Sequence, residues 1–114
     1  MVIRYSRKKK LSGEKRQKFQ ILLKRILREN TSREMIVDMD KLYHKILLAL
    51  GYEGTFGEIL KAVPNEIWDI DKVWEIHKLR NKIVHDFDDH DERFLRKKVW
   101  EYRKQLEILL ENTK

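Results

Sequence analysis

The sequence contains no cysteine among its 114 residues, so disulfide bonds and thiolate-based metal sites are excluded. This absence fits a reducing compartment, and we expect a cytoplasmic protein. Long hydrophobic runs are also missing. The longest, residues 46–50, is far shorter than a membrane span, and no apolar signal segment follows the basic N-terminus. With one proline, four glycines and 39% charged residues, the composition predicts helices with few turns.

Positive charge is concentrated in the first third of the chain. Residues 1–33 contain twelve Lys or Arg and two Asp or Glu, whereas residues 34–114 contain fourteen and seventeen, and the net charge is +7. Such a basic segment favours binding to a polyanion such as RNA. A solvated, solubilising tail explains the same charge equally well. The candidate RNA contacts in the arm are Arg7, Lys8, Lys9 and Lys10.

Apolar residues recur at helical spacing along the chain, and no segment alternates with the period of a strand. Thr31 and Thr55 are each followed three residues later by glutamate, a pattern typical of a helix start. We therefore expect an all-α, up-and-down antiparallel bundle of four long helices and one short helix. The domain should span residues 12–112 after a basic arm at 1–11. The helices are expected at about residues 12–29, 32–50, 56–63, 70–86 and 92–111.

Three polar residues interrupt the fourth predicted helix at Arg80, Asn81 and His85. Arginine suits phosphate recognition, and histidine can transfer protons near pH 7. Asn81 and His85 are one helical turn apart, so the amide can orient the imidazole. Lys78 and Lys82 flank the group as candidate RNA contacts. The pattern indicates phosphodiester chemistry with neither metal nor cofactor. The aspartates in residues 86–91 lack the glycine and distal glutamate of a calcium loop.

The string His-Lys-Leu-Arg-Asn-Lys-Ile-Val-His-Asp-Phe, residues 77–87, resembles the signature of HEPN domains, in which Arg is followed by His after four to six residues. The resemblance implies a metal-independent endoribonuclease with a toxin or defence role. A ribose 2′-hydroxyl would attack the phosphorus and leave a cyclic phosphate. Arg80 would bind the phosphate, His85 would transfer the proton, and Asn81 would hold His85 in position. It also implies a homodimer in which two copies of residues 74–86 meet antiparallel.

The resemblance has further implications and two open points. Family toxins have an antitoxin or a nucleotidyltransferase partner, and some carry a modified tyrosine two residues after the histidine, where this chain has Phe87. An acidic residue on an earlier helix often lies near the arginine, with Glu34, Asp38 and Asp40 as candidates. The alternative is a non-catalytic subunit that binds RNA, a nucleotide or another protein, with the three polar residues forming a structural network. We expect Trp68, Trp74 and Trp100 to be core or interface anchors.

Overall fold

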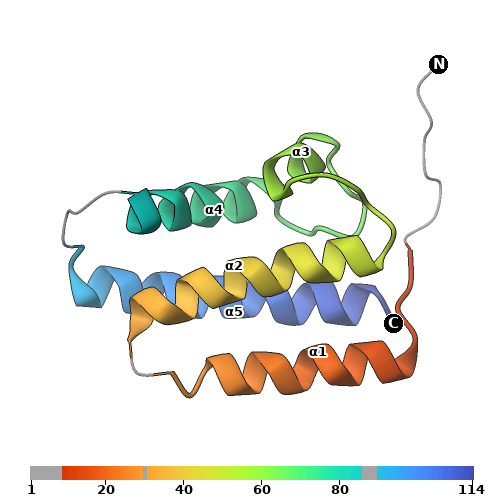
Figure 1. The fold of residues 1–114 in the computed structure, drawn as a ribbon, viewed down its shortest axis with the longest axis horizontal. Helices are drawn as coiled ribbons and strands as arrows, with labels where there is room; N and C mark the ends of the chain where they lie inside the picture. Colours follow the sequence, from red (N-terminus) through yellow and green to blue (C-terminus); the bar gives the residue numbers. More distant parts are fainter. Residues whose placement is uncertain (1–8, 30, 86–89) are drawn as a thin grey trace.

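The computed structural model describes residues 9–29, 31–85 and 90–114, and within these residues it contains five helices and no strands (Figure 1). The predicted all-helical class is therefore confirmed. The calls on Arg7, Lys8 and Phe87 lie outside the described residues. The helices are α1 (Gly13–Ile26), α2 (Ser32–Ala49), α3 (Phe56–Lys61), α4 (Ile70–His85) and α5 (Glu92–Asn112).

The helices form three layers, with α1 on one side, α2 and α5 in the middle, and α4 with the short α3 on the other side (Figure 1). Among α1, α2, α4 and α5, each helix runs opposite to the one before it. Helix α2 is central because it packs against α1, α4 and α5. Consequently the C-terminal end of α4 lies at one end of the bundle, and both the start of the described chain and its C-terminus lie near the other.

The core combines aliphatic side chains from every helix with a group of stacked aromatic rings. Tyr43 lies 5.6 Å from Phe56 and 5.9 Å from Tyr102 between ring centroids. The apolar stripe predicted for α4 is buried at Val73, Ile76 and Ile83. Two of the tryptophans do not enter the core, since Trp68 is 64% exposed and Trp100 is 69% exposed. For these two residues the core alternative was wrong, and the interface alternative stays a prediction.

Side-chain caps set the helix starts that the sequence predicted. Ser12 and Thr31 each accept a hydrogen bond from the backbone three residues on. Thr55 does so within a full capping box, because the side chain of Glu58 accepts from the backbone of Thr55. Helix α1 ends at Ile26, three residues before the prediction. The amides of Arg28 and Glu29 donate to carbonyls three positions back and close tight turns.

The end of the predicted arm is part of the folded unit. Leu11 is buried, and its amide donates to the carbonyl of Thr113 at 2.7 Å. The amide of Lys9 donates to the fully buried Glu66 at 2.5 Å, and the Tyr52 hydroxyl donates to the other carboxylate oxygen at 2.6 Å.

Within the described residues, no helix combines the length and apolar character needed to cross a bilayer.

Candidate functional site around Asp40 and the motif helix

Asp40 on α2 is the centre of a buried polar cluster that faces α4 and α5. Its Oδ1 accepts a hydrogen bond from the Tyr102 hydroxyl at 2.8 Å. His77 Nδ1 lies 3.1 Å from Oδ2, a distance at which the ring donates to the carboxylate. Asp40 is 4% exposed and Tyr102 is fully buried, so the carboxylate exchanges water for these donors. Burial and the charge of Asp40 raise the pKa of Tyr102 well above its ordinary value, which keeps the phenol a donor.

Arg80 joins this cluster from α4, which we call the motif helix because it carries Arg80, Asn81 and His85. Its Nε is buried and lies 3.7 Å from Asp40 Oδ2, within ion-pair range but beyond a hydrogen bond. Its Nη1 donates to Asn81 Oδ1 at 3.0 Å. The guanidinium side chain retains 26% exposure. Of the three acidic candidates near the arginine, the structure therefore selects Asp40, and it holds the guanidinium between the α2 carboxylate and the neighbouring amide.

His85 occupies a different side of α4. It is exposed, and it makes no hydrogen bond within the part of the chain that the structure describes. It is five positions along the helix from Arg80, which places the two side chains about 140° apart around the helix axis. The structure pairs Asn81 with Arg80, and no hydrogen bond between Asn81 and His85 is present among the described residues. Within a single chain, the arginine and the histidine do not converge.

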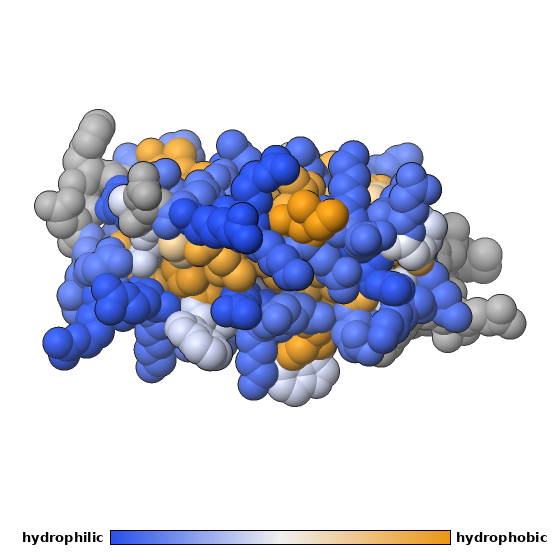
Figure 2. Space-filling model, turned by 90° about the horizontal axis from the view of Figure 1, so that it is seen from below, coloured by the Kyte–Doolittle hydropathy of each residue, from blue (hydrophilic) through white to orange (hydrophobic). Residues whose placement is uncertain are grey.

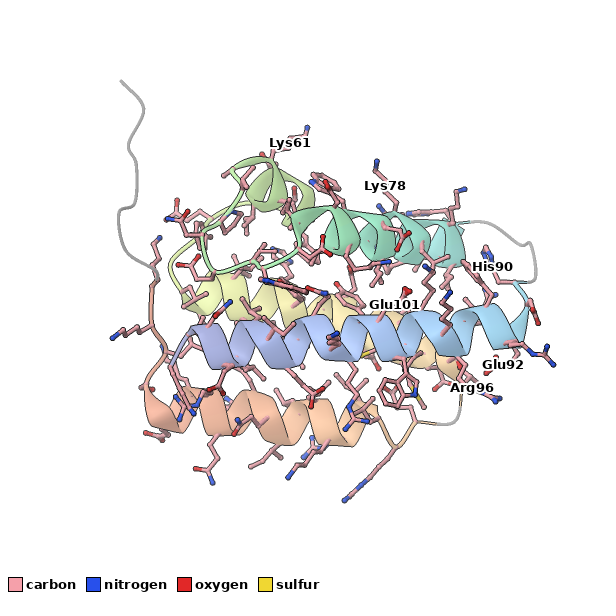
Figure 3. The ribbon with its side chains drawn as sticks, turned by 180° about the vertical axis from the view of Figure 1, so that it is seen from behind. Lys61, Lys78, His90, Glu92, Arg96 and Glu101 are labelled. Atoms are coloured by element: carbon pink, nitrogen blue, oxygen red, sulfur yellow. The ribbon has the colours of Figure 1, made fainter. Side chains whose placement is uncertain are left out.

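The candidate RNA contacts fall into two separate places. Lys78 and Lys82 are exposed on α4, and Lys78 extends away from the bundle with its ammonium 5.7 Å from the Trp74 ring (Figure 3). Lys10 is exposed near the opposite end of the bundle. The Lys9 ammonium lies 4.1 Å from the Tyr52 ring, so this side chain packs within the fold. Within the described residues, Lys9 and Lys10 of the arm and the motif are not brought together.

The sequence analysis did not identify His77 as a partner of Asp40 or Arg33 as a partner of the end of α4. The ring of His77 lies 6.1 Å from that of Trp74 between centroids, and His77 also binds Asp40. The signal was its position one turn from Asn81 on the same helix face. Arg33 donates to the carbonyl of Ile83 at 3.2 Å and so binds the open C-terminal end of α4. Only the contact between α2 and α4 reveals that role.

A groove of about 330 Å³ lies beside the last turn of α4. Glu29 and Asp38 line it opposite Ile83 and Val84. Burial, followed by a hydrogen bond to Asp38, raises the pKa of Glu29 to about 7. One proton shared by two carboxyl groups lets them approach closely at neutral pH. This acidic pair is close to the motif helix, yet none of the motif side chains lines the groove.

A helix-to-helix ion-pair cluster fixes the other side of α4 against α5. Lys98 is 9% exposed, and its ammonium lies 3.0 Å from Glu101 and 3.2 Å from Glu75. Lys72 lies 2.9 Å from Glu75 and 3.5 Å from Glu101. These pairs, together with Asp40, hold α4 from two directions. The motif helix is thus positioned by charge on both flanks.

The residues described here include no group of three or more His, Cys, Asp or Glu side chains placed to hold a metal ion. No family model, curated protein or solved structure matches the chain. The resemblance to HEPN domains therefore depends on residues 77–87 and on the all-helical architecture.

Proposed function

We propose that the protein is a metal-independent endoribonuclease of the HEPN type with a toxin or defence role. The observation that supports this most directly is Arg80, held by Asp40 and Asn81 on a helix whose last residue is His85. A pre-positioned guanidinium can neutralise charge as it develops on a phosphorane. A solvent-accessible imidazole at the end of the helix can take or give a proton.

The separation of Arg80 from His85 within one chain makes a second copy part of the proposal. Two motif helices packed antiparallel would place the arginine of each near the histidine of the other. Two imidazoles would then be present, one as base and one as acid in the same turnover. Val84, 47% exposed and next to His85, is an apolar contact available to such an interface. A homodimer through residues 74–86 is the proposed active form.

The chemistry follows from these positions. His85 of one copy removes the proton from a ribose 2′-hydroxyl, and the oxygen attacks the adjacent phosphorus. The bond from phosphorus to the 5′-oxygen breaks, and the partner's His85 protonates the leaving oxygen. Arg80 binds the non-bridging phosphate oxygens through the reaction. The products are a 2′,3′-cyclic phosphate and a 5′-hydroxyl, with no water, metal or cofactor consumed.

A non-catalytic role is the second candidate, and a specific observation favours it. Asp40, Tyr102, His77 and Arg80 form a connected polar cluster that joins three helices. Such a cluster can serve packing specificity alone. In that case the same face would bind RNA, a nucleotide or a protein partner such as an antitoxin or nucleotidyltransferase, and no bond would be cleaved.

Replacing His85 by Ala separates the two candidates. For the nuclease, labelled RNA should remain at least a hundredfold more intact with His85→Ala than with wild type, because general acid–base catalysis contributes about that much. RNA retention on a filter should change less than twofold. His90→Ala, a histidine outside the motif, is the matched control and should cleave normally. If wild-type protein leaves RNA intact from pH 5 to 9 but retains it on the filter, the non-catalytic candidate is correct.

A further inference from the structure

Among the described residues, α1 and its flanks carry a strong excess of positive charge. Residues 9–28 contain eight Lys or Arg and a single acid, Glu14. We name the exposed cations of α1 and of the turn that follows it the α1 basic face: Lys15, Lys18, Lys24, Arg25 and Arg28. Within the described residues none of the five forms an ion pair, whereas the lysines between α4 and α5 are paired with glutamates. This positive charge is not used by the fold.

The α1 basic face lies across the bundle from the motif helix. Helices α2 and α5 separate α1 from α4 (Figure 1), and the Cα atoms extend over 44 × 32 × 19 Å. Seen from the α1 side, hydrophilic side chains surround separate apolar patches (Figure 2). Lys18 and Arg25 border a shallow depression on this face, and Glu14 and Ile21 also line it. A ligand on this face therefore does not contact Arg80 of the same chain.

We propose that the α1 basic face is a second RNA-binding surface, which holds the sugar-phosphate backbone of a segment away from the motif. From Lys15 to Arg25 the helix rises about 15 Å. This length matches about four nucleotides at 3.4 Å per step. Lysine and arginine side chains without carboxylate partners are available to contact phosphates. Each such contact releases a counterion from the nucleic acid, and this release favours binding.

Two other occupants fit the face less well. A membrane-surface helix inserts a broad apolar side into the bilayer, but the apolar side of α1 is buried in the core at Phe19 and Leu23. Within the described residues of α1, Ile21 is the one large apolar side chain that is exposed. A tight protein interface is centred on aromatic or arginine anchors in closed pockets, and the depression here is shallow and open.

The test measures binding of a 24-nucleotide 2′-O-methyl RNA by fluorescence polarisation across a salt series. This RNA has no attacking hydroxyl, so binding is measured whether or not the proposed nuclease activity exists. The test variant carries Lys18→Gln and Arg25→Gln. The control carries Lys61→Gln and Lys97→Gln, two exposed lysines on α3 and α5 without ion pairs among the described residues. Thermal unfolding confirms that both variants are folded.

The expected result follows from counterion release. Loss of two phosphate contacts should make the slope of log K against log salt shallower by about 1.4, and weaken binding roughly tenfold or more at 0.1 M salt. The control should stay within twofold of wild type. The proposal is overturned if wild type does not bind, if the test variant keeps the wild-type slope, or if the control loses as much. Binding to vesicles of phosphatidylserine and phosphatidylcholine with no RNA binding would also overturn it.

Discussion

The two outer layers of the bundle, α1 and α4, use their charged side chains in opposite ways. On α4, Lys72 and Arg80 each contact a carboxylate of a neighbouring helix. On α1, the five cations of the α1 basic face have no acidic partner among the described residues. Charge on α4 therefore positions a helix, and charge on α1 remains available for an external anion. The free energy of unfolding should therefore depend on the paired charges of α4 and not on the cations of the α1 basic face.

The largest effect is expected at Asp40. Asp40→Ala removes the acceptor shared by Tyr102 and His77 together with the ion-pair partner of Arg80, and it leaves buried donors unsatisfied. The free energy of unfolding should fall by about 3 kcal/mol, as for other broken buried pairs. Urea denaturation gives this value. Asp71→Ala, which removes an exposed carboxylate at the start of α4, is the control and should change stability by less than about 0.5 kcal/mol.

The ion-pair cluster between α4 and α5 should have a smaller effect. Lys98→Ala removes a nearly buried ammonium together with its packed stem, and it leaves Glu75 and Glu101 with Lys72 as their remaining partner among the described residues. We expect a loss of about 1–2 kcal/mol in the free energy of unfolding. Part of the loss should disappear in 1 M salt, because screening weakens the interaction of partly exposed charges. A loss that is equal at all salt concentrations would show that the stem alone matters.

A pH effect is expected where the end of α1 meets the groove beside α4. The pKa of Glu29 is raised to about 7 in the folded protein, so the folded state binds more protons than the unfolded state between about pH 4.5 and 7. Stability from this group is fully present below that window and is lost as the pH rises through it. Glu29→Gln should reduce the fall in melting temperature between pH 5 and 7.5 relative to wild type. An unchanged difference would contradict the shared-proton arrangement with Asp38.

The smallest effect on stability is expected on the α1 basic face. Lys18→Gln with Arg25→Gln should change the free energy of unfolding by no more than about 0.5 kcal/mol, because neither cation has a partner in the described fold. Relief of repulsion among the cations should make any change favourable at low salt. Urea denaturation at 20 mM and 500 mM salt measures it. Destabilisation comparable to that of Lys98→Ala would remove the distinction between the two layers.

The helices and their order were predictable from the sequence because apolar spacing and capping residues act locally. Thr31 and Thr55 start helices as predicted, and Val73, Ile76 and Ile83 face the core. The selection of Asp40 over Glu34 and Asp38 was not predictable. It depends on how α2 is rotated against α4 and α5, and both other acids lie on the same helix. Trp68 and Trp100 are exposed, although tryptophan rings are on average highly buried in folded proteins.

The relation between Arg80 and His85 shows the same limit. The resemblance implies that Arg80 and His85 act on the same phosphate, and the spacing predicts that Asn81 orients His85. The guanidinium instead turns toward Asp40 on α2, because a carboxylate without water needs a cation or a donor. The amide oxygen of Asn81 accepts a hydrogen bond from Arg80, and His85 is exposed to solvent. A helical spacing gives the angle between two side chains, but the neighbouring helices decide which of them is buried.

The most direct measurement is the chemical nature of the ends produced from a labelled RNA by wild-type protein in EDTA. The nuclease proposal predicts fragments with a 2′,3′-cyclic phosphate and a 5′-hydroxyl, at a rate that EDTA does not change, and no fragments from the same sequence with 2′-O-methyl groups. Fragments with a 5′-phosphate, cleavage of the 2′-O-methyl RNA, or no cleavage at any pH from 5 to 9 would contradict it.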